Sequence, residues 1–410
     1  MMNTLHGNAM VGQSGGPTAA INATLSGVIR GVLSARDTIP TLYGLRNGVE
    51  GLLQERMVDL TAILGKEEDL CTLEDTPAAA LGSCRYKLPK PDADRATFDK
   101  ILAIFKKYDV RYFFYIGGND SMDAVAKLSA YLETVDYEMR VIGVPKTIDN
   151  DLVGTDHTPG FGSAAKYIAT TIKEIIRDCA VYTIPAVTIV EIMGRDAGWL
   201  TASASLASLT GEGPDLIYLP ERDFSLEAFF ADVKRALARH PNVVVAVSEG
   251  LRFADGTYVG ASAQSGAVDT FGHAYLAGTG KFLESAVKSE IGCKVRAVEL
   301  NLPQRCAAHL ASATDIEESV RTGKTAVSAA ISGVHGHMMV AVRTDDPYRV
   351  EISSSPVSAI ANMVKTVPDA YINAEGNGIT EAGVAYLAPL IVGERAPKYE
   401  LGMPKHFVIR

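Results

Sequence analysis

Two clusters of polar side chains in the middle of the chain follow apolar runs and contain residue types that bind anions or accept protons. The first is Gly-Gly-Asn-Asp-Ser at 117–121, and the second is Pro-Lys-Thr-Ile-Asp-Asn-Asp at 145–151. A carboxylate fixed at the end of a rigid strand can take a proton from a hydroxyl group within hydrogen-bonding reach. We therefore expect the stretch from Arg111 to Asp151 to form the reaction centre.

Buried strands must position these clusters. Val110 to Ile116 and Arg140 to Val144 are largely apolar, as expected for a parallel sheet that is covered on both faces. Open α/β sheets bind ligands at the carboxyl ends of such strands. Both clusters are therefore expected at one edge of a single sheet.

A glycine-rich turn near the start of the chain is a further candidate. A short strand, Asn8 to Val11, leads into the turn at 12–18, and apolar residues then recur at helical spacing from Ile21. This order of elements can direct backbone N–H groups and the positive end of a helix at a phosphate. For Gly15 and Gly16 taken alone, an ordinary tight turn is the better explanation.

The rest of the chain alternates between strands and helices, which predicts a doubly wound α/β arrangement. No repeat, low-complexity tract or proline-rich linker marks a domain boundary. The expected strands are 186–192, 216–219, 243–247 and 338–342, and the expected helices include 160–177, 199–209, 225–240, 322–332 and 356–364.

Composition narrows the class of protein. The chain has 410 residues, of which 47% are hydrophobic and 21% charged, as is usual for a soluble globular protein. No apolar run reaches the roughly 20 residues that a membrane span needs, and Met1 to Met10 lack the features of a secretory signal. We expect a cytoplasmic location with no membrane partner, and reduced thiols for the five scattered cysteines.

The motifs, taken in their order along the chain, resemble those of the 6-phosphofructokinases, in particular the diphosphate-dependent branch. They are the glycine turn at 15–16, the two central clusters, Met-Gly-Arg at 193–195 and the run 296–305. The resemblance implies an α/β fold of two Rossmann-like three-layer α/β/α domains with mostly parallel sheets and the site in the cleft between them. The phosphoryl-donor domain would comprise 1–163 and about 303–350, and the sugar-phosphate domain 164–302 and about 351–410.

This resemblance implies reversible transfer of a phosphoryl group from diphosphate to the 1-hydroxyl of D-fructose 6-phosphate, a reaction of glycolysis and gluconeogenesis. Asp149 matches the catalytic aspartate and would accept the proton, while Thr147 would bind the sugar phosphate or its hydroxyl. Asp151 would orient the loop or a metal-bound water. A plain structural alternative is that an aspartate in this turn caps backbone N–H groups.

Charge on the transferring group would be met by Mg²⁺, by Arg85 and Lys146, and by the N–H groups of Gly15 and Gly16. A planar guanidinium such as that of Arg85 can hold two phosphate oxygens at once. The formal net charge of −9 argues against nucleic acid as a partner and also disfavours anionic substrates. Local clustering of cations would overcome that average repulsion.

By the same resemblance, a further set of residues would bind the sugar phosphate: Met193, Gly194, Arg195, Glu249, Arg296, Leu302 and Arg305. Arg296 is expected to come from a neighbouring subunit, so the site would be complete only in a homodimer or homotetramer.

The donor depends on two positions. ATP-dependent members of the family have glycine where this chain has Asp120, and commonly glycine where it has Lys146. A carboxylate at 120 would repel a nucleotide α-phosphate, and the lysine offers a cation to a shorter donor. Both positions therefore favour diphosphate.

The chain also departs from the family pattern. Asn119 replaces a magnesium-ligating aspartate, so Asn119 and Asp120 are the candidate metal ligands. Leu302 stands where relatives have a histidine or tyrosine, and Ala186 stands in the place of a subunit-crossing arginine. His157 and His309 lie near the motifs, but a structural histidine is the commoner explanation for each.

Three alternatives stay open from the sequence. They are an ATP-dependent 6-phosphofructokinase, an enzyme for a related ketose phosphate, and a non-catalytic regulatory subunit that binds sugar phosphate. The segment after about Thr322 is longer than in compact ATP-dependent bacterial members of the family, and we expect it to pack on both domains.

Overall fold

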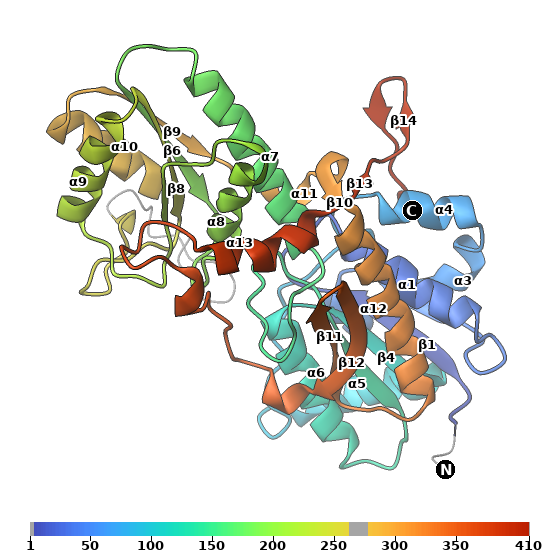
Figure 1. Ribbon diagram of the computed structural model, residues 1–410. Coiled ribbons are helices and arrows are strands. Elements are labelled where there is room, and N and C mark those ends of the chain that lie inside the picture. The colour runs from blue at the N-terminus through green and yellow to red at the C-terminus, as the bar shows by residue number, and fades with distance from the viewer. Residues whose placement is uncertain (1–3, 262–277, 410) are drawn as a thin grey trace.

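Two sheets form the body of the protein, and each is covered by helices on both faces (Figure 1). The structure is a computed structural model that describes residues 4–261 and 278–409. The larger sheet has seven strands in the order β12-β11-β5-β4-β1-β2-β3, and the smaller has four in the order β7-β8-β6-β9. This is the predicted α/β architecture with mostly parallel sheets.

The centre of the larger sheet consists of parallel strands whose side chains are apolar on both faces. Its strands are β1 (Asn8–Gln13), β2 (Leu42–Leu45), β3 (Met57–Asp59), β4 (Val110–Gly117), β5 (Arg140–Pro145), β11 (His337–Asp345) and β12 (Tyr348–Pro356). Along β4, Tyr112 and Phe114 pack in one cluster, and Phe113 and Tyr115 pack in the cluster on the opposite face. Successive side chains of a strand point to opposite faces, so an unbroken apolar run requires a helical layer on each side.

Those two layers come from distant parts of the chain. α1 (Ile21–Leu33) and α12 (Ala313–Ile331) cover one face, and α5 (Arg95–Lys107) and α6 (Asn119–Leu132) cover the other. The helices α2 (Gly48–Leu53), α3 (Leu60–Ile63) and α4 (Glu67–Glu74) complete this body. α12 begins where Ser312 accepts a hydrogen bond from the N–H of Asp315, a usual N-cap.

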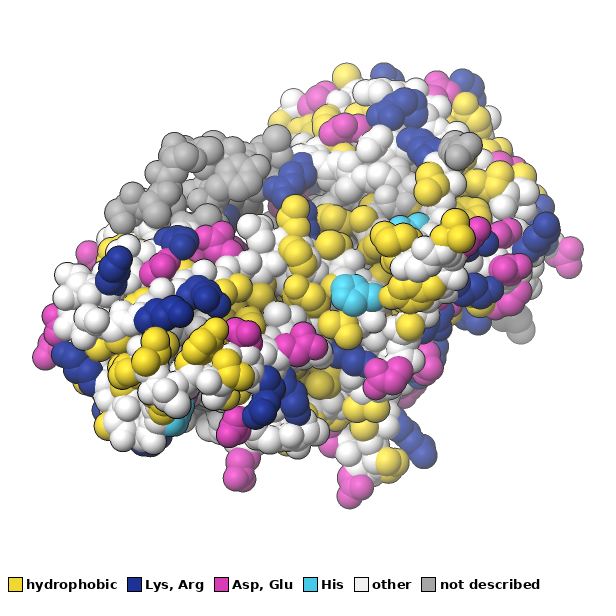
Figure 2. All heavy atoms as spheres, turned by 90° about the horizontal axis from the view of Figure 1, so that it is seen from above, with side chains coloured by type: hydrophobic (Ala, Val, Ile, Leu, Met, Phe, Trp, Pro, Cys, Tyr) yellow, Lys and Arg dark blue, Asp and Glu magenta, His cyan; other side chains and the backbone are white. Residues whose placement is uncertain are grey.

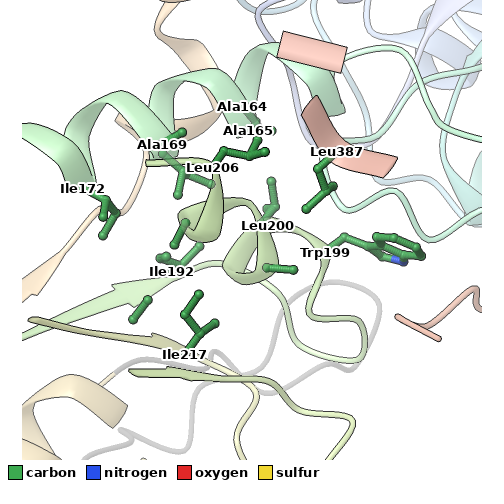
Figure 3. Close-up of a cluster of buried hydrophobic side chains, with 14 of the residues drawn as sticks. Ala164, Ala165, Ala169, Ile172, Ile192, Trp199, Leu200, Leu206, Ile217 and Leu387 are labelled. Carbon is green, nitrogen blue, oxygen red and sulfur yellow. The ribbon is translucent and has the colours of Figure 1, made fainter. Parts of the chain in front are cut away.

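The smaller sheet is parallel throughout. Its strands are β6 (Ala186–Ile192), β7 (Leu216–Tyr218), β8 (Asn242–Ser248) and β9 (Lys294–Glu299). α7 (Phe161–Cys179) and α8 (Trp199–Ala202) cover one face, with a buried apolar cluster shown in Figure 3, and α9 (Leu226–Leu237) and α10 (Thr279–Glu290) cover the other. The predicted helix at 199–209 is only partly confirmed, because Ser203–Thr210 forms a 3-10 helix.

The C-terminal part of the chain packs on both halves, as expected. Val367 and Leu387, the latter in α13 (Glu381–Leu387), join the core of the smaller sheet, whereas Ile409 joins that of the larger sheet. Arg395 in β13 (Glu394–Arg395) pairs with Asp75 at 2.6 Å. The remaining short elements are α11 (Pro303–Cys306), β10 (Ala311–Ser312), β14 (Tyr399–Glu400) and β15 (Met403–Pro404).

One expectation for this part of the chain was wrong, and another is refined. The helix predicted at 356–364 is absent: Pro356 is the last residue of β12, and only a short 3-10 helix, Val357–Ala359, follows. The boundary predicted near residue 350 falls inside β12, which pairs along its whole length with β11 as a hairpin. We therefore assign all of β12 to the donor half and keep the two-domain division as a proposal.

Among the described residues, no helix combines the length and apolar character needed to cross a bilayer.

Candidate active site

Three adjacent strands deliver the predicted donor-side residues to one edge of the larger sheet. β4 lies between β1 and β5, and Gly117 at the end of β4 is paired with Pro145 at the end of β5. The N–H of Lys146 donates to the carbonyl of Gly117 at 2.9 Å. The two central clusters are therefore neighbours, as the strand order requires.

Lys146 is buried at the centre of this edge. Only 2% of the residue is exposed, and its Nζ donates to the carbonyl of Gly16 at 2.5 Å. Burial lowers the pKa of Lys146 to about 8, against the opposing charges of Asp149 and Asp151; the positive charges of Arg305 and Arg85 lower it further. Two arginines far apart in the sequence thus act on this lysine.

The glycine turn lies against this lysine. Gly15 has a φ of +77°, which favours glycine, and a Cβ at this position would lie 3.3 Å from Lys146 Nζ. Its N–H donates to the carbonyl of Cys84 at 3.3 Å, and Ser83 Oγ donates to its carbonyl at 2.6 Å. The N–H of Gly15 is therefore engaged within the protein, and the role in phosphate binding stays a prediction.

Arg85 follows Cys84 directly, so the same contacts hold its backbone beside the glycine turn. The residue is exposed. The helix α1 begins only at Ile21, so its N-terminus does not directly follow the two glycines. The sequence predicted a helix directly after the glycine turn, whereas the structure has a further loop segment before the helix begins.

Asp149 lies in a turn after β5 and is partly exposed. Its N–H donates to Thr147 Oγ1 at 3.1 Å, and that hydroxyl lies 3.5 Å from Asp149 Oδ2. Burial raises the pKa of Asp149 to about 7, and the charge of Asp151 acts in the same direction; Lys146 and Arg195 oppose both effects. Such a carboxyl can exchange a proton near neutral pH.

A divalent cation would find suitable oxygens beside this turn. Asn119 Oδ1 and Asp151 Oδ1 are both buried and accept no hydrogen bond from the described residues. They follow adjacent strands, and hard oxygens of this type suit Mg²⁺. No group of three or more His, Cys, Asp or Glu side chains in the described ranges could hold a metal, so diphosphate and water would supply most ligands. Asp120 is exposed in the first turn of α6.

The predicted sugar-side residues follow the strands of the smaller sheet. The N–H of Gly194 donates to Glu249 Oε1 at 3.2 Å, which joins the loop after β6 to the end of β8. Gly194 has a φ of +138°, and a Cβ there would lie 2.7 Å from the carbonyl oxygen of Ala197. Burial raises the pKa of Glu249 to about 7, with a further contribution from Asp149 on the other half. Met193 at the start of this loop donates its N–H to Gln304.

The run from 296 to 305 divides between the site and the surface. A Cβ on Gly16 would lie 3.6 Å from Arg305 Nη1, so this arginine reaches the glycine turn. Leu302 is 53% exposed. Arg296 lies midway along the edge strand β9, paired with Thr188, and is exposed. Within one chain the structure therefore does not bring Arg296 to the other predicted site residues.

Two histidines and a lysine lie near these motifs in the sequence or in space. His157 is buried between Asp156 and Glu318, at 2.8 and 2.7 Å, so it is a structural histidine, whereas His309 is exposed. Lys365 contacts the turn after Asp149, although the sequence did not indicate it. A single lysine more than two hundred residues further along the chain carries no motif that could have revealed it.

Comparison with known proteins agrees with this geometry. The sequence profile described as phosphofructokinase matches residues 8–330. The chain belongs to the phosphofructokinase family. A protein of Xanthomonas campestris named pyrophosphate–fructose 6-phosphate 1-phosphotransferase is 44% identical over 99% of this chain and 96% of its own length. A protein of the same name from Halomonas elongata is 42% identical, covering 97% and 95%.

Solved structures of this family are also similar. The pyrophosphate-dependent phosphofructokinase of Nitrosospira multiformis has a TM-score of 0.89 at 37% identity, covering 98% of this chain and 96% of its own. That of Marinobacter aquaeolei has a TM-score of 0.87 at 38% identity, with 98% and 95% covered. A sulfofructose kinase of Alkalicoccus urumqiensis is 33% identical over 88% of this chain and 91% of its own length.

Proposed function

We propose that this phosphofructokinase transfers a phosphoryl group from diphosphate to the 1-hydroxyl of D-fructose 6-phosphate. The products are fructose 1,6-bisphosphate and phosphate, and the reaction runs in either direction. The observation that carries the proposal is the convergence of Asp149 with the cations Lys146 and Arg305, where Arg195 of the other half also acts on Asp149. The names of the similar proteins support the same substrates.

Asp149 acts as the proton acceptor. As the sugar hydroxyl oxygen bonds to phosphorus, its proton passes to the Asp149 carboxylate, and the bond to the bridging oxygen of diphosphate breaks to release phosphate. Thr147 lies against Asp149 and orients either the carboxylate or the hydroxyl. In the reverse direction the same carboxyl returns the proton.

Positive groups stabilise the charge on the transferring phosphoryl group. Lys146 and Arg85 act on the donor side, together with the backbone N–H of Gly16, since that of Gly15 already donates to Cys84. Phosphoryl transfer depends mainly on positioning and electrostatic stabilisation, so these groups supply most of the catalysis. Mg²⁺, when bound by Asn119 and Asp151 together with diphosphate and water, would neutralise donor charge, with Asp120 nearby as a further ligand.

Donor selection follows from Asp120 and Lys146. Asp120 is exposed at the start of α6, where its carboxylate repels the extra phosphate of a nucleotide. Lys146 supplies a buried cation to the terminal phosphate of a short donor. Diphosphate carries no adenosine, so no purine pocket is needed.

The acceptor is held from the smaller sheet. Arg305 and Arg296 bind the 6-phosphate and Glu249 accepts hydrogen bonds from sugar hydroxyls, beside Met193, Gly194, Arg195 and the exposed Leu302. Arg296 joins this set from a neighbouring subunit of a homodimer or homotetramer. Sulfofructose is a second candidate acceptor, because a relative at 33% identity is named a sulfofructose kinase.

One assay tests the proposal. Purified protein with Mg²⁺ is supplied with fructose 6-phosphate or sulfofructose, and with diphosphate or ATP, in every combination. We expect turnover with diphosphate and fructose 6-phosphate, and improved use of ATP in the Asp120→Gly variant. Activity with ATP alone would refute the donor assignment, and activity with neither donor would favour a regulatory subunit.

A further inference from the structure

A short C-terminal stretch, residues 365–367, lies between the loop that follows Asp149 and the loop that follows Arg195. Its main contact with the first loop is Lys365, whose N–H donates to the carbonyl of Asp151 at 2.8 Å. The Lys365 ammonium donates to three oxygens of the same loop, Asn150 Oδ1 at 3.2 Å, Thr155 O at 3.2 Å and Asp156 O at 2.6 Å. A lysine has three donors, so these bonds use its full hydrogen-bonding capacity.

The same stretch also binds the second loop. Trp199 Nε1 donates to the carbonyl of Lys365 at 2.9 Å, and Lys365 Nζ lies 5.3 Å from the centre of that indole ring. Glu221 Oε1 accepts from the N–H groups of both Gly198 and Val367, at 2.8 and 2.9 Å. Residues 365–367 are therefore tied to the segment that begins at Met193.

The first loop is also fixed to the larger sheet. The N–H of Asp156 donates to the carbonyl of Ala341 in β11, and the N–H of Ala341 donates to Thr155 Oγ1. His157 adds a contact with Glu318 of α12. These partners belong to the larger sheet and its helices. Lys365 and its neighbours join the loop to the smaller sheet's side of the site, together with Tyr386, whose hydroxyl donates to Asp156 O at 2.7 Å and accepts from Asn150 Nδ2 at 3.3 Å.

We propose that Lys365 is a positioning residue that sets the separation between Asp149 on one half of the site and Arg195 on the other. This inference rests on the function proposed above. Lys365 touches neither reacting group; it acts through Asn150 and Asp151, which follow Asp149 directly, and through Trp199, which ends the loop after Arg195. A proton acceptor must lie within hydrogen-bonding reach of the sugar hydroxyl, and a misplacement of about 1 Å can lower a rate about 100-fold.

The test compares Lys365→Met with Lys365→Arg. Methionine keeps most of the apolar stem but removes all three donors, whereas arginine keeps a cation and its donors. We expect kcat of Lys365→Met to fall about 10- to 100-fold, with the dissociation constants of fructose 6-phosphate and diphosphate close to those of the wild type. Lys365→Arg should recover part of the lost kcat.

Lys166→Met is the matched control. Lys166 also ties the C-terminal part of the chain to a helix, since its Nζ donates to the carbonyl of Gly393 at 2.5 Å, but it lies on α7, outside the loops that follow Asp149 and Arg195. We expect Lys166→Met to lower Tm without changing kcat. A Lys365→Met enzyme with unchanged kcat, or one that loses sugar affinity in parallel with kcat, would overturn the proposal.

A second readout does not depend on turnover. Trp199 is the only tryptophan of the chain and is 3% exposed, so acrylamide quenching reports on this contact directly. Quenching should increase in Lys365→Met and not in Lys166→Met, and no increase would overturn the proposal.

If the wild type shows no turnover with diphosphate, the proposed function fails, and the quenching result alone decides the inference. Should Lys365→Met fail to fold, Trp199→Phe removes one bond of the same link, and a normal kcat in that variant would overturn the proposal.

Discussion

At the scale of single residues, the site combines a carboxyl and an ammonium whose pKa values are displaced toward each other. Burial and Asp151 raise the pKa of Asp149 to about 7, and burial lowers that of Lys146 to about 8. Burial removes water from both side chains, and this disfavours the charged form of Asp149 and of Lys146 alike. Between these values, Asp149, the proposed base, is ionised while Lys146 is still charged.

A bell-shaped pH profile should follow. Asp149 must be ionised to accept a proton, so kcat/KM should rise as pH increases through about 7. Lys146 must be charged, so kcat/KM should fall as pH increases through about 8. Because kcat/KM reports the free enzyme, bound diphosphate should move the upper limb of the kcat profile to higher pH. Initial rates over this range test the assignment, and a kcat/KM that stays constant as pH increases through about 7 would contradict it.

At the scale of elements, the donor half depends on close packing of α1 against α12. Gly27 of α1 lies against Gly323 of α12, and an added Cβ on Gly323 would collide with the carbonyl oxygen of Thr24. Two helices can approach at backbone distance only where side chains are absent. This contact holds α12 in place, and Glu318 of α12 binds His157, which follows the turn that contains Asp149.

We expect Gly323→Ala to be destabilising. The added methyl would force the helices apart, at a cost of about 1–3 kcal/mol, so Tm should fall in calorimetry. Gly65→Ala is the control, because no atom lies within 4 Å of its added Cβ. A Gly323→Ala protein as stable as Gly65→Ala would show that the contact is not needed.

At the scale of the whole molecule, the net charge of −9 and the anionic substrates are reconciled by local arrangement. On the face shown in Figure 2, acidic and basic side chains are interspersed, without a continuous field of one sign. The cations that act on Lys146 and Asp149, namely Arg85, Arg195 and Arg305, come from both halves of the chain. Under the proposed function, these cations offset the substrate charge between the two halves.

The proposed sharing of Arg296 between subunits predicts complementation. Asp149→Asn and Arg296→Ala should each have very low activity alone. A mixed dimer would contain one site with both native residues, so equal mixing with subunit exchange should restore roughly a quarter of wild-type activity, as twofold symmetry requires. Rates measured before and after exchange test this. Failure to recover activity, with mixed dimers verified by mass, would place Arg296 outside the neighbouring site.

The sequence by itself determined the central strands and the clusters at their ends, since unbroken apolar runs and the polar residues that follow them are local features. It also indicated the family, because the motifs from Gly15 to Arg305 occur in the family's order. His157 was rightly expected to be structural.

Only the tertiary structure decided what depends on distant partners. Pro356, the first residue of the stretch predicted as a helix, belongs instead to β12, whose pairing with β11 local spacing does not reveal. The partners of Lys365 lie up to 215 residues away in sequence, and no short pattern specifies such a contact. Burial of the two cores brings these segments together when the chain folds. The separation between Asp149 and Arg195 is therefore set by the tertiary structure.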